Sequence, residues 1–240
     1  MTDFPLRYRL EYKYYVPASF YQHILNDLDN FVELDKHVTK QNRFYPVYSL
    51  YFEDFGLSSY HDKLAGQINR LKMRLRFYDL DTSSGLIKTE LKYKFSDLYL
   101  KRQSALDHNL FQKLINKKIF PLDTIKNPET KRFLMIAKYN NFRPFIRIDY
   151  ERQALYAKND KNVRITFDKN VKCSRVTTGN LKPFNIRVLP LGTIILEIKT
   201  PNYFPYWLTY IIKKYNLKRV AISKYTLAVQ NLATNSSLCI

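Results

Sequence analysis

The sequence predicts an α+β fold in which an antiparallel eight-stranded β-barrel is flanked by helices. Three observations predict it: segments that alternate apolar and polar residues, segments with helical spacing between them, and rows of cations on one side of the alternating segments. Hydrophobic residues make up 45% of the 240 residues and aromatic residues 15%, which is enough to fill a core. We expect one domain over residues 1–230 and a flexible C-terminal tail over residues 231–240.

Strands are predicted where residues alternate with period two and Tyr, Phe, Ile and Val are frequent. These segments are Arg7–Val16, Tyr45–Glu53, Asn69–Tyr78, Leu86–Phe95, Phe145–Tyr156, Val163–Phe167, Gly192–Thr200 and, more weakly, Arg219–Tyr225. Many are joined by short turns, which is typical of an antiparallel sheet. The sheet is expected either to close on itself or to pack against helices.

Helices are predicted between these strands. The first is Pro17–Phe31, which begins with a proline near the first helical position. Its Phe20, Ile24 and Leu28 lie on one stripe, as expected for a helix that packs on a sheet. The other helices are Leu106–Lys117, Pro128–Tyr139 and Pro205–Tyr215.

Cations share one side of several predicted strands. In Asn69–Tyr78, one parity holds Arg70, Lys72, Arg74 and Arg76, and the other holds Leu71, Met73 and Leu75. Successive side chains of a strand point to opposite faces, so these cations lie on one side. Similar rows are Arg7, Arg9, Glu11 and Lys13; Lys88, Glu90, Lys92 and Lys94; Arg164, Thr166 and Asp168; and Glu197 with Lys199. Many aromatic residues have the opposite parity, where helices should cover them.

Rows of like charge are costly unless they face water or bind an anion. Two unit charges about 5 Å apart repel by roughly 3 kcal/mol at an effective dielectric constant of about 20. A solvated sheet face is the simplest explanation for any one row, but such a face usually mixes both signs. A closed barrel with a charged interior would gather the cations around a thin anionic ligand, and a linear chain of phosphates fits that description.

Composition and motifs exclude several other classes of protein. The formal net charge of +19 indicates an anionic partner, yet none of the five glycines forms a dinucleotide-binding or P-loop motif. The four histidines lack zinc-like spacing, and Cys173 and Cys239 form no C-x-x-C pair. Nucleic acid is not expected as a partner, because the aromatic side chains lie opposite the cations. No apolar run has the length of a transmembrane segment and no secretory signal is present, so we expect a cytoplasmic location.

A series of short motifs extends from about Arg7 to Gln230. The motifs are E-Y-K-Y-Y-V at Glu11–Val16, Y-S-L-Y-F-E at Tyr48–Glu53, Y-x-x-K-L-x-G at Tyr60–Gly66, R-L-K-M-R-L-R-F-Y at Arg70–Tyr78, T-E-L-K at Thr89–Lys92, R-P-F-I-R-I-D-Y-E-R at Arg143–Arg152, V-R-I-T-F-D at Val163–Asp168, L-E-I-K at Leu196–Lys199 and S-K-Y at Ser223–Tyr225. In this order they resemble the VTC domain, the catalytic module of the vacuolar transporter chaperone polyphosphate polymerases. These belong to the triphosphate tunnel metalloenzymes. The chain departs from the CYTH-type triphosphatases of that superfamily, because it lacks their E-x-E-x-K motif in the first strand.

The resemblance implies a tunnel in which cations hold a triphosphate and a glutamate binds Mn²⁺ or Mg²⁺. The phosphate ligands that it implies are Lys13, Arg74, Arg76, Lys92, Arg152 and Arg164. Further ligand contacts are implied at Lys101, Tyr150, Lys199, Ser223 and Lys224, and the implied metal ligand is Glu197. The assignment of Lys101 leaves open a shift of one residue, because it lies in the run K-R-Q at Lys101–Gln103. Strand parity independently places Arg74, Arg76 and Lys92 in one class.

The function that the resemblance implies is transfer of the γ-phosphate of ATP onto a polyphosphate chain. Such a reaction needs mainly positioning and charge neutralisation, which arginine, lysine and a metal ion supply. The partners expected are ATP, triphosphate or polyphosphate. Two alternatives stay open: a metal-dependent triphosphatase, in which water attacks, and a polyphosphate-binding module without turnover. Glu197 favours metal chemistry, since a pure polyanion binder has little use for a carboxylate among cations.

Overall fold

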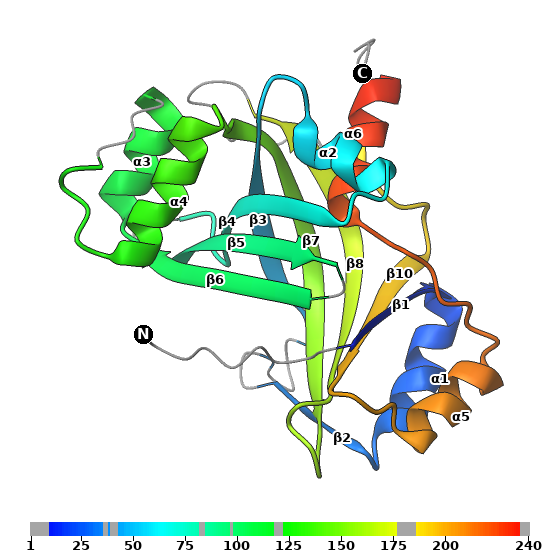
Figure 1. Cartoon of the computed structure of the whole chain (residues 1–240). Helices are drawn as coiled ribbons and strands as arrows, with labels where there is room; N and C mark the ends of the chain where they lie inside the picture. Colours follow the sequence, from blue (N-terminus) through cyan, green and yellow to red (C-terminus); the bar gives the residue numbers. More distant parts are fainter. Residues whose placement is uncertain are drawn as a thin grey trace. The chain divides into compact units, whose positions relative to one another are not determined.

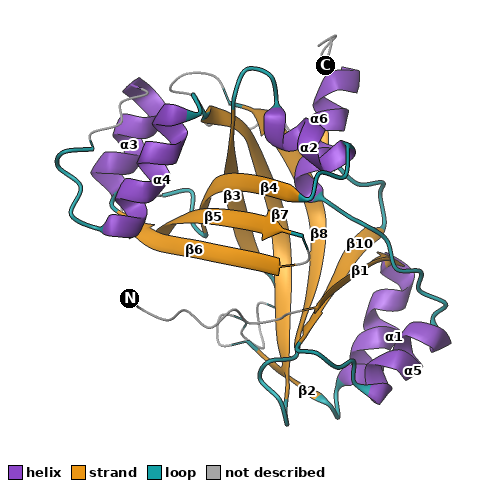
Figure 2. Cartoon of the chain, in the orientation of Figure 1, coloured by secondary structure: helices purple, strands orange, loops and turns teal. Residues whose placement is uncertain are grey.

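The computed structural model describes residues 10–35, 38, 43–81, 85–96, 98–117, 122–176 and 186–235 (Figure 1). Within them are strands and helices in an α+β arrangement, which Figure 2 separates by colour. The strands are β1 (Leu10–Pro17), β2 (Val32–Leu34), β3 (Tyr45–Glu53), β4 (Asn69–Phe77), β5 (Ile87–Phe95), β6 (Leu98–Leu106), β7 (Arg143–Ala157), β8 (Arg164–Arg175), β9 (Ile186–Arg187) and β10 (Thr193–Thr200). The helices are α1 (Ala18–Leu28), α2 (Ser58–Leu64), α3 (His108–Lys117), α4 (Pro128–Tyr139), α5 (Tyr206–Lys214) and α6 (Lys224–Asn235).

The chain divides into two compact units. The first comprises residues 1–46, 150–171 and 189–223, and the second comprises residues 47–149, 172–188 and 224–240. Strands β7 and β8 are long enough to contribute residues to both units. Arg7 and Arg9 of the first predicted row lie outside the described residues, as do residues 236–240 of the predicted tail. Helix α6 includes residues 231–235 of that tail.

In the first unit, the strand order is β1-β10-β8-β7, with β2 paired to β7. The pairing is antiparallel, and Lys13 lies opposite Glu197, which lies opposite Thr166. Residues of the other parity are apolar and form a core with α1 and α5. This core includes Tyr14, Val16, Ile24, Leu28, Ile165, Phe167, Leu196, Ile198, Leu208 and Ile211. The helices therefore cover the apolar side of the strands and leave the charged side to the site.

In the second unit, the strand order is β7-β3-β4-β5-β6, with β9 paired to β8. One side of these strands packs against α3 and α4, and the core includes Leu50, Phe52, Met73, Leu75, Phe77, Leu91, Phe111, Leu114, Phe133 and Leu134. Helix α4 begins where its sequence predicts, because Asn127 accepts hydrogen bonds from the backbone N–H groups of Glu129 and Thr130 and Pro128 occupies the first turn. The charged side of β4 and β5 faces away from this core.

The predicted eight-stranded barrel is wrong in its closure and strand count. Among the described residues, the strands form an antiparallel sheet of ten strands, and its main path has two ends, β1 and β6. Period-two patterning decides which side chains share a face, but it does not decide whether the first and last strands pair. The apolar sides of β1 and β6 belong to separate helix-covered cores, so their burial does not depend on closure.

Most predicted elements are confirmed within a few residues, and the errors have local causes. Strand β6 was missed because Leu98–Leu106 mixes polar and apolar residues on both parities. The weak strand prediction at Arg219–Tyr225 is wrong, since only one isolated bridge, Tyr14 to Arg219, forms there and α6 begins at Lys224. Helix α2 and helix α6 were not predicted; in α6, Tyr225, Ala228, Val229 and Leu232 are buried at helical spacing.

Candidate functional site

The charged side of β4, β5 and β6 in the second unit is strongly cationic. In the antiparallel register, Lys72 lies opposite Lys92, which lies opposite Lys101, and Arg76 lies opposite Lys88. We call this surface the cationic face, and it consists of Arg70, Lys72, Arg74, Arg76, Lys88, Glu90, Lys92, Lys94 and Lys101. It therefore places eight Lys and Arg side chains around a single carboxylate. The parity prediction for Arg74, Arg76 and Lys92 is confirmed.

Glu90 lies at the centre of the cationic face and is only 3% exposed. Its Oε2 accepts a hydrogen bond from Nε of Arg74 at 2.7 Å and lies 2.6 Å from Nη2 of the same guanidinium. Its Oε1 accepts from Nζ of Lys101 at 2.9 Å, and Nη2 of Arg76 lies 3.6 Å from Oε2. Burial acts to raise the pKa of Glu90, but Arg74, Arg76 and Lys101 outweigh it and hold that pKa well below its usual value. Glu90 is therefore ionised at neutral pH.

Two buried polar atoms beside this carboxylate have no hydrogen-bond partner within the described part of the chain. They are Nε of Arg76 and Oγ of Ser49. Ser49 on β3 lies directly opposite Arg76 on β4, so the two groups are neighbours. An unsatisfied buried polar group costs about 1–3 kcal/mol, and proteins usually meet that need with water or a ligand. The pair is therefore positioned to donate to an anion.

The structure also distinguishes Lys101 from its neighbour Arg102. Lys101 points to the cationic face and contacts Glu90, whereas Nη1 of Arg102 donates to Oε1 of Glu129 on α4 at 2.8 Å. Because α4 packs on the opposite side of the strands, Arg102 does not belong to the cationic face. The register therefore favours Lys101 over Arg102 as the residue of the predicted site.

Aromatic side chains join the cationic face to the start of α6. The Tyr51 hydroxyl accepts a hydrogen bond from Nη1 of Arg74 at 2.8 Å, and its ring centroid lies 5.0 Å from that of Tyr225. Nζ of Lys72 lies 5.2 Å from the centroid of the Tyr225 ring. Tyr225 donates to the buried carboxylate of Glu53, which also accepts from the Ser59 backbone N–H. Lys224, a predicted ligand contact, is the first residue of this helix.

The charged side of the first unit has a different character. Here Lys13, Arg152, Arg164 and Lys199 lie among Glu11, Asp35, Asp168 and Glu197. We call these eight residues the balanced face, because four cations are matched by four carboxylates. The predicted phosphate ligands Lys13, Arg152 and Arg164 and the predicted contact Lys199 therefore each lie beside a carboxylate.

Glu197 lies between two lysines of the balanced face. Its Oε1 is 2.8 Å from Nζ of Lys199, and its Oε2 is 3.7 Å from Nζ of Lys13. Nζ of Lys13 also lies 2.7 Å from Oε1 of Glu11 and donates to the Ile222 carbonyl at 3.1 Å. Oγ1 of Thr166, opposite Glu197 on β8, is buried and has no hydrogen-bond partner among the described residues. Glu197 and Thr166 thus present oxygen atoms beside two cations.

Arg152 and Arg164 make further ion pairs on the balanced face. Nε of Arg152 donates to Oδ1 of Asp168 at 2.6 Å, and Nη2 donates to Oδ2 at 2.7 Å. The Arg152 guanidinium lies 5.1 Å from the ring centroid of Tyr150, another predicted contact. Nη2 of Arg164 donates to Oδ2 of Asp35 at 3.2 Å, while its buried Nε has no partner within the described residues. Ser223 is the remaining predicted residue of this unit and directly precedes α6.

The donor set around Glu197 fits a metal ion that arrives with phosphate better than a resident metal. No group of three or more His, Cys, Asp or Glu side chains that could hold a metal occurs among the described residues. Mg²⁺ is commonly bound by one or two carboxylates together with phosphate oxygens and water. Glu11 and Glu197, which contact the same lysine, supply such carboxylates.

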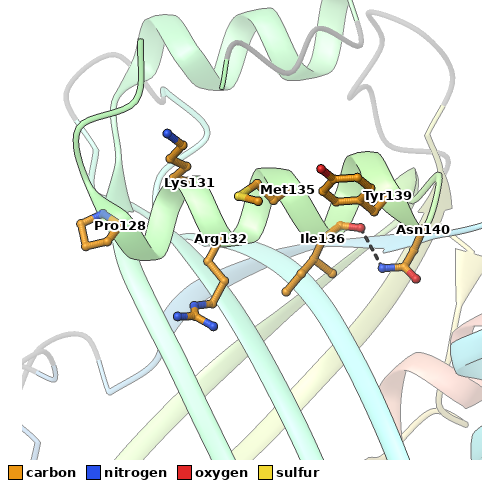
Figure 3. Close-up of a pocket in the computed structure, with 7 residues that line it drawn as sticks. All are labelled: Pro128, Lys131, Arg132, Met135, Ile136, Tyr139 and Asn140. Carbon is orange, nitrogen blue, oxygen red and sulfur yellow. Dashed lines mark hydrogen bonds between the residues drawn. The ribbon is translucent and has the colours of Figure 1, made fainter. Parts of the chain in front are cut away.

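Two pockets lie elsewhere in the structure. The first, on α4, has a volume of about 450 Å³ and is lined by Pro128, Lys131, Arg132, Met135, Ile136, Tyr139 and Asn140 (Figure 3). The second has a volume of about 390 Å³ and lies by Phe31, Tyr203 and Trp207 in the first unit. Neither pocket includes a residue of the cationic face or the balanced face, so neither corresponds to the predicted site.

Comparison with known protein families identifies the family to which the chain belongs. The sequence model of the VTC domain matches residues 8–233, which is nearly the whole chain. The chain belongs to the VTC domain family. A comparison of this VTC domain with curated proteins found no match. Among solved structures, it is similar to the PH1819 protein from Pyrococcus horikoshii OT3, with 15% sequence identity, a TM-score of 0.49, and coverage of 93% of this chain and 99% of that one.

No described helix of the VTC domain has both the length and the apolar character needed to span a membrane.

Sequence reasoning missed Ser49 and Asp35 in the site. A signal for Ser49 was present, since it shares the parity of Tyr51 and Glu53 in a strand that is otherwise largely apolar. Asp35 follows β2 and contacts Arg164 from a distant part of the sequence, and no local pattern pointed to that contact.

Proposed function

We propose that this VTC domain is a metal-dependent phosphotransferase that moves the γ-phosphate of ATP onto a polyphosphate chain. The observation that carries the proposal is the cationic face, where eight cations surround one carboxylate and Nε of Arg76 and Oγ of Ser49 lack partners among the described residues. Arginine binds phosphate oxygens in a two-pronged manner, and lysine adds compact charge. Membership of the VTC domain family supports the same class of ligand.

In this proposal the chain's residues bind and orient phosphates and neutralise their charge. Arg74, Arg76, Lys92 and Lys101 hold a chain of phosphates, and Ser49 adds a hydroxyl donor. Glu197 and Glu11 would hold Mn²⁺ or Mg²⁺, which would supply further neutralisation of phosphate charge. No protein nucleophile is needed, because an oxygen of the terminal phosphate of the growing chain attacks the γ-phosphorus of ATP, the bond to the β-phosphate breaks and ADP leaves.

The test is one incubation of the purified chain with ATP and Mn²⁺, analysed for long-chain polyphosphate and for free phosphate. The proposal expects polyphosphate, and it expects the yield to collapse in Arg76→Met and to persist in Arg102→Met. The second variant is a matched control, because Arg102 pairs with Glu129 on the opposite side of β6. Free phosphate without polyphosphate would make the chain a triphosphatase. Triphosphate binding without either product would make the chain a binding module. Either of these two results would overturn the polymerase proposal.

A further inference from the structure

A carboxylate in the middle of a phosphate-binding surface calls for a physical explanation. Glu90 repels the anion that the cationic face is proposed to bind, yet it is nearly fully buried and contacts three cations. Its distances to Arg74 and Lys101 are those of strong charge-assisted hydrogen bonds. Because burial of a carboxylate is costly without such partners, these contacts fix the positions of both cations relative to β5.

The surroundings of Lys101 show what Glu90 contributes. From β4, Arg74 and Arg76 face Lys101; from β5, Glu90 and Lys92 face it; and its neighbour of the same parity on β6 is the neutral Gln103. The pKa of Lys101 is lowered to about 8: burial is the largest cause and Arg74 and Arg76 act in the same direction, while Glu90 acts to raise the pKa by both charge and hydrogen bond. Glu90 thus opposes the effects of burial and of both arginines on this ammonium group.

We propose that Glu90 is a positioning residue that orients the Arg74 guanidinium and keeps Lys101 protonated, so that it sets the affinity of the cationic face for triphosphate. The inference rests on the proposed function, because it concerns the same ligand at the same face. It extends that function by making triphosphate affinity depend on pH. Triphosphate binds to the charged form of Lys101, and Glu90 stabilises that form.

The experiment measures the dissociation constant of triphosphate by calorimetry between pH 6 and pH 9.5, without metal, for the whole chain. The variants are Glu90→Gln, which removes the charge and keeps the shape, and Lys101→Arg, which stays charged throughout this range. Dividing each constant by that of Lys101→Arg at the same pH cancels the titration of triphosphate itself. In the unmodified chain, this ratio should rise roughly tenfold as the pH passes through about 8, since a charged donor to phosphate is lost.

The diagnostic result is the pH at which the ratio rises. In Glu90→Gln the rise should come at lower pH, because the attraction that holds the proton on Lys101 is gone. A merely structural role for Glu90 would weaken binding equally at every pH and leave the midpoint in place. An unchanged midpoint, or tighter binding of Glu90→Gln at every pH, would overturn the inference.

The proposed function and the inference fail in different ways. If the unmodified chain binds no triphosphate at pH 6.5, the proposed function fails. If it binds but the ratio to Lys101→Arg is flat across the pH range, the inference alone fails. The comparison of the unmodified chain with Lys101→Arg does not require Glu90→Gln to fold. Circular dichroism of each variant verifies its secondary structure.

Discussion

Arg152 and Asp168 form a two-pronged ion pair that is almost completely buried, with the Asp168 side chain 0% exposed. The pair joins β7 to β8 on the balanced face. Burial acts to lower the pKa of Arg152, but Asp168 opposes it and the pKa lies well above the usual value for arginine. One edge of the Arg152 guanidinium is therefore committed to Asp168, and any phosphate that this residue binds must be bound by the rest of the group.

Breaking this pair should strongly destabilise the chain. Arg152→Ala leaves the Asp168 carboxylate buried without its partner, and removal of one member of such a pair costs about 3–5 kcal/mol. Urea denaturation followed by circular dichroism measures the loss. Lys161→Met is the matched control, because the Lys161–Glu33 pair is exposed and should contribute less than about 1 kcal/mol. A cost for Arg152→Ala no larger than that of the control would contradict this prediction.

Arg76 should matter for triphosphate affinity far more than Arg102. Arg76→Met removes a guanidinium whose buried Nε has no partner among the described residues, and loss of a charged hydrogen bond of about 1.5–3 kcal/mol weakens binding roughly 10–100-fold. Arg102→Met removes the same charge from the opposite side of β6 and should change the affinity by less than about threefold. Calorimetric titration of both variants decides the matter, and equal losses would show that only net charge counts.

Glu197 should be required for the effect of metal on binding. In Glu197→Gln, triphosphate should still bind in the presence of EDTA, because no cation is removed, but addition of Mn²⁺ should no longer strengthen binding. Asp168→Asn is unsuitable as a control because it is structural, so Glu33→Gln, an exposed carboxylate, serves instead. Retention of the full Mn²⁺ effect in Glu197→Gln would remove Glu197 from the metal site.

Burial of Glu53 should make stability depend on pH in a defined direction. Burial raises the pKa of Glu53 from its usual 4.5, although hydrogen bonds from Tyr225 and Ser59 oppose the rise. The folded chain therefore keeps this proton to higher pH than the unfolded chain. The free energy of unfolding should accordingly fall as the pH rises from 4.5 through the raised pKa.

Tyr225→Phe tests this account. It removes a hydrogen bond that lowers the pKa of Glu53, so the fall should extend to higher pH and the chain should lose about 1–3 kcal/mol at pH 7. Glu53→Gln should abolish this part of the pH dependence. Tyr139→Phe, at an exposed tyrosine, should leave stability unchanged. Denaturant titrations from pH 4 to pH 8 measure all three variants, and identical profiles for Tyr225→Phe and the unmodified chain would contradict the expectation.

The sequence by itself determined which residues share a side of each strand. The alternation in β4 and β5 placed Arg74, Arg76 and Lys92 together and placed Met73, Leu75 and Leu91 on the helix-covered side, because consecutive side chains of a strand point to opposite faces. The same property predicted most strands, and the proline before α1 and the apolar stripe of α1 predicted that helix, since these are local features of the chain.

Only the tertiary structure decided how the strands pair and which charges meet. The pairing of β1 with β10 brings Lys13 opposite Glu197, and the contact of Arg164 with Asp35 joins residues far apart in sequence. Strand register and sheet closure depend on non-local contacts, which period-two alternation does not specify. For that reason the sequence predicted rows of cations, whereas the structure divided them into a face with one central carboxylate and a face in which acids match the cations.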